Sequence, residues 1–501
     1  MPSIMPWIVV DVDSPYFQDE KGTDWTPVGQ NDAVTWPDFQ GLFKRKDVAQ
    51  AEGHMAYLAA HGVTCIRLMM EYCQTEGRYF EKPVGRFQSN MVQFWDDLFL
   101  LCEKYSIRVL VTPFDTFWMA RRWKYHPYNQ LLGGPCKSKW QWLSCPDMLS
   151  ALKERFTFFI ERWGGSGALF GWDLWNEISP VHAGKSIENL GRYIDDISTH
   201  IREKEMQLFQ KSHLQTISAF APILNEPGMN ALVFQHPLLD FASTHFYEPG
   251  SIDYPKNVHS AAITTGRMVR YALELLPAGR PFFDSEHGPI AYFRRNKKGL
   301  PEDFDDAHYL HMQWAHFASG AAGGGMRWPY RHPHVLTHGM RRAQQNLSAF
   351  VRLIDWKNFR RVNLNEEILV NRPSVRVFGC GDSNQAIIWL LYTGSNKAKI
   401  KLNEQQHLVS LSVPNLDDGH YRVVFWDTKM GIADQQIIAK SGIHLHIRRV
   451  VDLGNLAIAI QHYLPPANDQ TPGKGGTLPK HKQRWQGKGS HLNLSIRPAL
   501  D

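Results

Sequence analysis

The sequence has few of the features that define several large classes of protein. Its 501 residues include six cysteines, and no two of them form a CxxC pair or another spacing that suits a metal site. Cys65 and Cys102 lie in apolar runs and are expected to be buried thiols. Cys136 and Cys145 share one loop and could form a disulfide in an exported protein. No metal and no organic cofactor is implied.

Long hydrophobic runs are also missing. No apolar stretch approaches the ~20 residues that a membrane span needs, so we expect no membrane partner. The first residues, MPSIMPWIVVDVDSPYF, lack the basic start and the long apolar core of a signal peptide. We expect a cytoplasmic protein, with export after removal of a signal as the alternative. The sequence does not fix the oligomeric state.

Charge is nearly balanced except at one end. The net charge is +6, and residues 465–501 alone contain six Lys and Arg against two Asp. The remainder therefore has no basic face of the kind that binds nucleic acid. Pro, Gly, Lys and Gln dominate residues 465–501, and we expect this basic tail to be disordered.

Alternating apolar runs and helical patterns fill most of the chain. Eight strands are predicted at Thr26–Asp32, Gly62–Met70, Ile107–Asp115, Ala168–Trp175, Thr216–Pro222, Leu238–Tyr247, Arg280–Pro289 and Gly323–Tyr330. Strands that alternate with helices predict an α/β fold, a (β/α)8 TIM barrel over residues 1–355. A hairpin predicted over residues 7–25 could close the bottom of the barrel.

The pattern changes after residue 356. Short β-rich runs such as SVRVFGC, AIIWLLYTG, AKIKL and YRVVFWDT are separated by turn signals about every ten residues. This spacing predicts a small antiparallel β-sandwich, an accessory domain over residues 356–464.

Two of the predicted barrel strands end in a glutamate. The run ALFGWDLWNEI places Asn176 and Glu177 at the end of the fourth strand, and RPFFDSEHGP places Glu286 at the end of the seventh. The carboxyl ends of barrel strands are where chemistry is done. Cleavage of a glycosidic bond needs one carboxyl group to donate a proton and a second to stabilise the anomeric carbon. A pair of strand-end glutamates therefore suggests a site that acts on sugars.

The surroundings of each glutamate suggest its role. The apolar strand end would raise the pKa of Glu177, which makes it the candidate general acid/base. Glu286, the candidate nucleophile, needs donors and positive charge, which Arg67 and Tyr247 can supply from other strand ends. Asn176 can contact a sugar 2-hydroxyl. Three residues also have a purely structural interpretation. Arg67 could form an ion pair at the rim of the barrel, His245 could be a hydrogen-bonded histidine at the rim, and Trp328 could belong to the core.

Together these residues resemble clan A of the glycoside hydrolases, and most of all glycoside hydrolase family 5, the cellulase and mannanase family. The resemblance covers about residues 7–350 and rests on Arg67 in CIRLMM, Asn176 and Glu177 in WDLWNE, His245 and Tyr247 in HFY, Glu286 in DSEHG, and Trp328. It implies a retaining mechanism with a covalent glycosyl-enzyme, with Trp328 as the floor of the sugar site.

One position departs from the family pattern. Many members carry a histidine just past the third strand, whereas this chain has TPFDTFW, with Asp115 in its place and Trp118 nearby. We count both among the candidate substrate-binding residues. The tryptophan-rich loop that follows resembles that of mannanases and mannosidases.

The sequence thus predicts a retaining β-glycoside hydrolase acting on β-mannan or β-glucan-type carbohydrates. Exo-acting β-mannosidases and β-glucosidases, and transglycosylases, use the same residues. A carbohydrate-binding pseudoenzyme, or a scaffold that binds nucleic acid through the basic tail, are the alternatives from other classes.

Overall fold

The computed structural model describes residues 5–464, apart from 12–13, 46, 75–77, 221–223, 225, 227, 394–405 and 453–455. The tail predicted to be disordered, 465–501, and the strand predicted at AKIKL lie outside the described residues. Among the helices that are described, none combines the length and the apolarity needed to cross a membrane.

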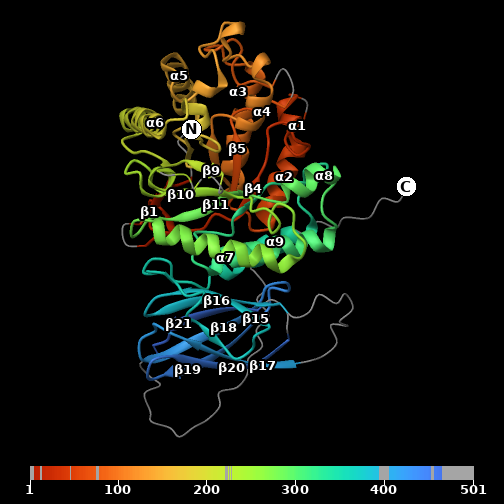
Figure 1. The fold of residues 1–501 in the computed structure, drawn as a ribbon, viewed down its shortest axis with the longest axis vertical. Coiled ribbons are helices and arrows are strands. Elements are labelled where there is room, and N and C mark those ends of the chain that lie inside the picture. The colour runs from red at the N-terminus through yellow and green to blue at the C-terminus, as the bar shows by residue number, and fades with distance from the viewer. Residues whose placement is uncertain are drawn as a thin grey trace, which may run out of the picture.

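The larger, N-terminal part of the molecule is built around a barrel of parallel strands (Figure 1). In barrel order the strands are β4 (Gly29–Asn31), β5 (Cys65–Met69), β6 (Arg108–Thr112), β7 (Leu169–Asp173), β8 (Leu214–Thr216) with β9 (Ser218–Phe220), β10 (Ala242–Phe246), β11 (Phe282–His287) and β12 (Met326–Arg327). β8 pairs with β7 and β9 pairs with β10. The two are halves of one predicted strand, so the nine-stranded sheet confirms the eight-unit barrel.

Helices surround this barrel, and the longer ones bury residues against it. They are α1 (Gln40–Phe43), α2 (Ala49–Ala60), α3 (Ser89–Tyr105), α4 (Thr116–Arg121), α5 (Pro146–Trp163), α6 (Ile187–Phe209), α7 (Val258–Leu275), α8 (Ile290–Asn296), α9 (Glu302–Ala318) and α10 (His338–Val351). In α6, Leu190, Ile194, Ile197 and Ile201 are buried at helical spacing. The side chain of Ser186 caps this helix by accepting a hydrogen bond from the amide of Asn189.

A small antiparallel sheet closes the bottom of the barrel. It consists of β1 (Ile8–Val10), β2 (Phe17–Asp19) and β3 (Asp24–Trp25). The ring of Phe17 contacts the rings of Phe170, Phe241 and Phe283, with centroids 5.1, 5.5 and 6.3 Å away. The predicted hairpin is confirmed in place, with a third strand added.

The fourth barrel strand is shorter than predicted. The prediction that Trp175 is still strand is wrong, because β7 ends at Asp173. The amide of Ser218, which could have continued the ladder, donates instead to Oδ1 of Asp173 at 2.9 Å. The chain then turns, and Glu177 adopts a φ of 55°, in the left-handed region.

The residues that follow the barrel form the predicted antiparallel sandwich. Its strands are β13 (Val362–Asn363), β14 (Leu369–Val370), β15 (Val375–Gly381), β16 (Gln385–Tyr392), β17 (Gln406–Val413), β18 (Gly419–Asp427), β19 (Ala433–Lys440), β20 (Leu445–Asp452) and β21 (Leu456–His462). They form a six-stranded sheet, β13-β15-β16-β21-β18-β19, and a three-stranded sheet, β14-β17-β20. β19, with the polar sequence ADQQIIAK, was not predicted, since it lies at the edge of its sheet and half of its side chains face solvent.

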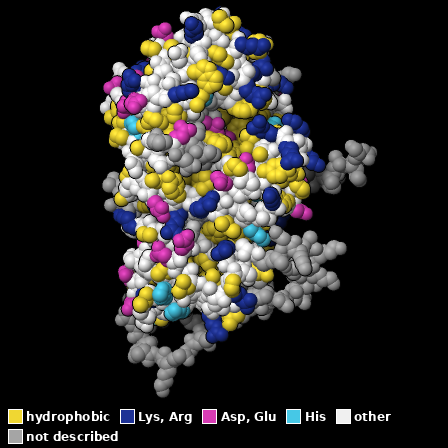
Figure 2. Space-filling model, viewed as in Figure 1, with side chains coloured by type: hydrophobic (Ala, Val, Ile, Leu, Met, Phe, Trp, Pro, Cys, Tyr) yellow, Lys and Arg dark blue, Asp and Glu magenta, His cyan; other side chains and the backbone are white. Residues whose placement is uncertain are grey.

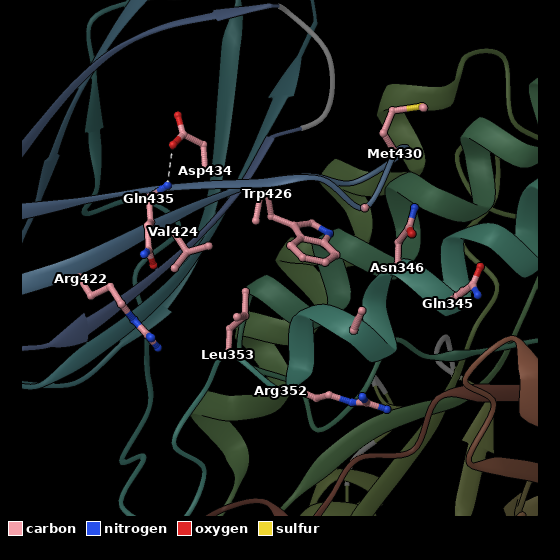
Figure 3. A pocket seen from close by; sticks show the side chains of 13 residues that line it. Gln345, Asn346, Arg352, Leu353, Arg422, Val424, Trp426, Met430, Asp434 and Gln435 are labelled. Atoms are coloured by element: carbon pink, nitrogen blue, oxygen red, sulfur yellow. Dashed lines mark hydrogen bonds between the residues drawn. The ribbon is translucent and has the colours of Figure 1, made fainter. Parts of the chain in front are cut away.

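The six-stranded sheet packs on both of its faces. Ile388 and Leu390 of β16 face the three-stranded sheet, whereas Trp389 and Leu391 join the core shared with α9 and α10 of the barrel. α7 and α9 lie between the barrel and the sandwich (Figure 1). A pocket of about 400 Å³ remains where α10 meets β18 (Figure 3).

Candidate active site

A cleft of about 610 Å³ opens at the carboxyl ends of the barrel strands. Most of the residues singled out in the sequence line it: Asp115, Trp118, Asn176, Glu177, Tyr247, Glu286 and Trp328. Arg67 and His245 lie directly beneath, fully buried. The fold therefore brings all nine candidate residues to one place, while their roles stay predictions.

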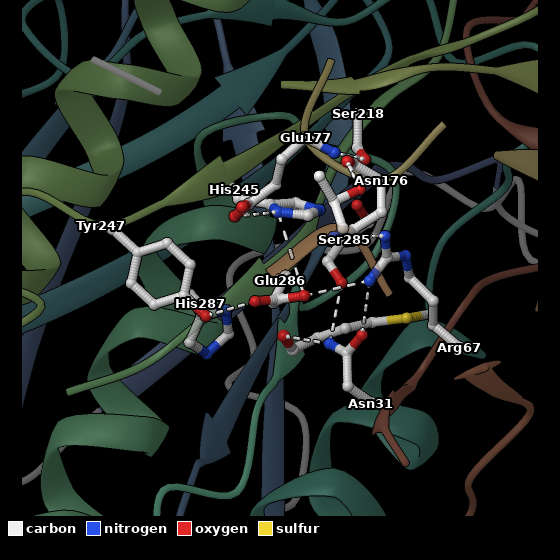
Figure 4. A network of polar contacts seen from close by, with 12 residues as sticks. Asn31, Arg67, Asn176, Glu177, Ser218, His245, Tyr247, Ser285, Glu286 and His287 are labelled. Carbon is white, nitrogen blue, oxygen red and sulfur yellow. Dashed lines mark hydrogen bonds and ion pairs between the residues drawn. The ribbon is translucent and has the colours of Figure 1, made fainter. Parts of the chain in front are cut away.

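Arg67 is the centre of the polar network below the cleft (Figure 4). Its Nη2 donates to Oδ2 of Asp173 at 2.7 Å and to Oδ1 of Asn176 at 2.6 Å. Its Nη1 donates to Oδ1 of Asn31 and to Oε2 of Glu286, both at 3.0 Å. The guanidinium thus joins the ends of four strands. Because two carboxylates share one cation, the site keeps a net negative charge.

Glu286 is held by donors on both oxygens. Besides the bond from Arg67, the hydroxyl of Tyr247 donates to Oε1 at 2.7 Å. Burial raises the pKa of Glu286 above its usual value, and the Arg67 cation and the Tyr247 hydrogen bond oppose this shift. These partners favour the ionised form that a nucleophile needs. The next hydroxyl outward, that of Tyr330, lies 3.0 Å from that of Tyr247.

The turn after Glu286 depends on a glycine. Gly288 has a φ of 155°, and a Cβ at this position would lie 2.7 Å from the ring of Tyr330. Just before it, Nδ1 of His287 lies 2.7 Å from Oδ2 of Asp284, whose other oxygen accepts the amide of Phe246 at 3.1 Å. These contacts fix the end of β11 against β10.

Glu177 has a different environment. Its amide donates to Oγ of Ser218 at 3.2 Å, and its Oε1 lies 3.0 Å from Nδ1 of His245. Burial raises its pKa to about 7; Arg67 opposes this shift and Asp173 adds to it. Burial likewise lowers the pKa of His245 to about 4, so this imidazole is neutral near pH 7. The protonated carboxyl expected at this position is therefore consistent with its surroundings.

The two glutamates lie close together. One oxygen of Glu177, one of Glu286 and a ring nitrogen of His245 all lie within 4.8 Å of one another. Carboxyl groups about 5–5.5 Å apart are typical of retaining glycosidases, while inverting enzymes leave about 6.5–9.5 Å for a water. The two groups also differ in their partners: burial raises the pKa of Glu177 to about 7, whereas Glu286 accepts hydrogen bonds from the Arg67 cation and the Tyr247 phenol.

The remaining candidates form the walls of the cleft. The amide oxygen of Asn176 is engaged by Arg67, which leaves the amide nitrogen to face a ligand. Trp328 packs at 5.1 Å against Trp36, and Nε1 of Trp118 donates to Tyr72 at 3.2 Å. Trp118, Trp328 and Tyr72 are thus among the aromatic side chains that line the cleft.

Asp115 lies where the family pattern expects a histidine. Its Oδ1 accepts the amide of Trp118 at 3.1 Å and caps α4, while Oδ2 is buried without a partner among the described residues. Burial raises the pKa of Asp115 to about 8, opposed by the Trp118 amide. A neutral carboxyl at this position can both donate to and accept from a sugar hydroxyl.

Four residues of the site were not predicted. Asn31 and Asp173 hold Arg67, and Tyr72 and Tyr330 line the cleft. Asp173 carried a usable signal, because a carboxylate inside an apolar run requires a buried cation, and Arg67 was the buried cation available. Asn31 ends the first strand in the same way that Asn176 follows the fourth.

Three side-chain groups among the described residues could hold a metal ion: Glu71, Cys73 and His126; Asp32, Asp38 and His54; and Glu177, His245 and Glu286. In the first, Arg155 already neutralises Glu71 at 2.7 Å. In the second, His54 separates the two aspartates, with one ring nitrogen 3.4 Å from Asp32 and the other 3.6 Å from Asp38. The third is the pair of glutamates described above.

Known proteins resemble this one in structure and not in sequence. The sequence matches no protein-family model, and no curated protein is similar to it. Its structure, by contrast, is similar to solved structures of glycoside hydrolases, so the barrel with its trailing sandwich is a fold found in that class.

Two of these structures span nearly the whole chain. A glycoside hydrolase of family 5 from Bacteroides vulgatus superposes with a TM-score of 0.57 at 12% identity, covering 92% of this chain and 95% of the other. Another glycoside hydrolase gives a TM-score of 0.56 at 12% identity and covers 92% and 98%. The predicted resemblance to family 5 is confirmed at the level of the fold.

Proposed function

We propose that this protein is a retaining β-glycoside hydrolase. The observation that carries the proposal is the pair Glu177 and Glu286, with oxygens within 4.8 Å of each other and with Glu286 held by the Arg67 cation and the Tyr247 hydroxyl. The likeness of the fold to family 5 glycoside hydrolases supports the same conclusion.

In the first step, Glu286 attacks the anomeric carbon while Glu177 donates its proton to the leaving glycosidic oxygen. The bond to the leaving sugar breaks as the bond to Oε of Glu286 forms, giving a glycosyl-enzyme. Arg67 and Tyr247 hold the attacking carboxylate in place. The Asn176 amide is placed to bind the 2-hydroxyl, a contact that strengthens in the transition state.

In the second step, Glu177, now ionised, takes a proton from a water that attacks the same carbon. The bond to Glu286 breaks and the anomeric configuration is retained. His245 is neutral and lies 3.0 Å from Glu177, so it can hold the carboxyl in position in either protonation state.

The substrate we propose is a β-mannan or β-glucan-type backbone. The flat rings of Trp328, Trp118 and Tyr72 line the cleft and suit the apolar faces of hexoses. Carbohydrate is the one partner that the proposal requires.

Covalent labelling tests the proposal. A 2-deoxy-2-fluoro β-mannoside or β-glucoside with an activated leaving group should add one glycosyl mass to the protein, on the peptide that contains Glu286. The Glu286→Gln variant is the control and should take up no label. A carbohydrate-binding pseudoenzyme would bind these sugars without being labelled, and label on a different residue would contradict the assignment.

A further inference from the structure

Two segments that flank the cleft are basic and contain no acidic residue. Residues 116–146 hold five Lys and Arg and no Asp or Glu, and residues 288–301 hold four and none. The whole chain has a net charge of only +6, so everything outside these segments is net negative. Lys and Arg side chains gather over α8 in the space-filling view (Figure 2).

Three of these cations line the cleft itself. They are Arg121 at the end of α4, and Arg294 and Lys297 at the end of α8, and all three are exposed. None forms an ion pair with a described residue, whereas other surface cations of the barrel do, such as Arg162 with Asp96 at 2.7 Å. Arg121 lies over the rings of Phe117 and Trp118, at 5.4 and 5.9 Å, and both rings line the cleft.

Other groups at the mouth cancel only part of this charge. Asp253 lines the cleft, and its Oδ1 accepts the amide of Gly250 at 3.2 Å. His332 and His334 lie on the same wall, and His334 stacks on Trp36 at 4.6 Å. A mouth with unpaired cations attracts anions, because field lines are focused by the low-dielectric walls of a cleft.

The floor of the cleft has the opposite character. Asp115, Glu177 and Glu286 line it, and Asp173 lies below. Burial raises the pKa of Asp115 to about 8 and that of Glu177 to about 7, so the negative charge comes mainly from Glu286 and Asp173, the two carboxylates that share Arg67. An anionic group on the sugar that is attacked would face this cluster and be repelled. The same group on a neighbouring sugar would lie at the mouth, within reach of the cations.

We propose that the natural substrate is an acidic glycan, in which sugars next to the scissile bond carry carboxylate or sulfate groups that bind Arg121, Arg294 and Lys297. The inference rests on the proposed function for the identity of the cleft and adds the substrate class. The attacked sugar itself is neutral, and the anionic groups lie on its neighbours.

The test measures binding and needs no turnover. Galactomannan in neutral, carboxymethylated and sulfated forms is cast into native gels, and the retardation of the full chain gives an apparent Kd for each. We expect at least tenfold tighter binding to a charged form than to the neutral one, weakening as salt is raised. The form that binds more tightly shows whether carboxylate or sulfate is preferred.

A matched pair of double variants separates the cleft from the helix surface. Arg294→Ser with Lys297→Ser removes two charges that line the cleft, and Arg295→Ser with Lys298→Ser removes two from the same segment that do not. The first should lose most of the preference for charged glycan, and the second should keep it. Melting temperatures check that both variants are folded.

Several outcomes would overturn the inference. One is equal binding to neutral and charged galactomannan, and another is an equal loss of the preference for charged glycan in both double variants. A third is equally tight binding to double-stranded DNA, which would make the mouth a general polyanion surface. Tight, charge-dependent glycan binding without any hydrolysis would instead overturn the proposed function and leave this inference standing.

Discussion

At the scale of single residues, the site contains two glutamates with different partners: Glu286 pairs with Arg67, and Glu177 lies beside the imidazole of His245. Glu177 gains its raised pKa from burial, and Glu286 gains its donors from Arg67 and Tyr247. The backbone of Glu177 also carries a cost, since a left-handed φ of 55° is unfavourable for a residue with a Cβ. Such costs are typical of functional sites.

The raised pKa of Glu177 predicts a pH-dependent cost in stability. In the folded protein the carboxyl titrates at about 7 instead of its usual 4.5, so the folded state binds the proton more tightly. Folding is therefore favoured below pH 4.5, and this contribution is lost as the pH rises through 7. Glu177→Gln, which cannot ionise, should be more stable than the wild type by about 1 to 3 kcal/mol at pH 8.

Denaturant unfolding at pH 4 and pH 8 checks this prediction. The difference between Glu177→Gln and the wild type should be small at pH 4 and should grow toward pH 8. A difference of the same size at both values would mean that the carboxyl is not buried in the way described.

The sequence identified the residues that meet at the cleft because strand-end position is readable from an apolar run and its last polar residue. It did not identify Tyr72 or Tyr330, because an aromatic residue in a loop carries no periodic signal, and it missed Asn31 although this residue ends β4. The role of Asp115 could not be predicted either, since its raised pKa comes from burial that only the packed loop creates.

At the scale of elements, the three-stranded sheet β1–β3 stabilises the barrel from below without touching the site. Phe17→Ala should lower the free energy of unfolding by about 3–5 kcal/mol, because it leaves a cavity among Phe170, Phe241 and Phe283. Catalysis at a temperature where the variant is folded should be nearly unchanged.

A substitution at an exposed apolar residue provides the control. Leu100 is 68% exposed on α3, and Leu100→Ala should change stability by less than about 0.5 kcal/mol. If Phe17→Ala unfolds no more readily than Leu100→Ala, the N-terminal sheet is not part of the barrel core.

Strands could be predicted from the sequence where apolar residues follow one another in a clear run. The eight barrel strands were predicted within a few residues. The split of the fifth strand into β8 and β9 was not, because it follows from the Asp173 carboxylate taking the amide of Ser218. The edge strand β19 was missed because a strand with one solvated face and Gln at two central positions has no apolar run.

At the scale of the whole molecule, the barrel and the sandwich share a core. We propose that the barrel needs the sandwich domain, residues 356–464, for its stability. The sequence suggested instead an accessory domain that follows the barrel. Trp389 and Trp426 of the sandwich lie in the same cluster as Trp314 and Phe350 of the barrel helices. The continuous apolar run in β16 reflects this double burial.

Truncation tests this arrangement. A fragment of residues 1–355 would expose the shared core and should aggregate or melt well below the full chain. A fragment of residues 1–464 keeps the core and should melt at the temperature of the full chain. A soluble 1–355 fragment with the full melting temperature would show that the two domains are energetically independent.

The most direct test of the central claim is the turnover of Glu286→Gln beside the wild type on β-linked glycans and aryl β-glycosides. We predict that the wild type hydrolyses at least one β-mannoside or β-glucoside and that the variant loses several orders of magnitude in kcat while keeping its melting temperature. A folded Glu286→Gln protein with ordinary turnover would contradict the account.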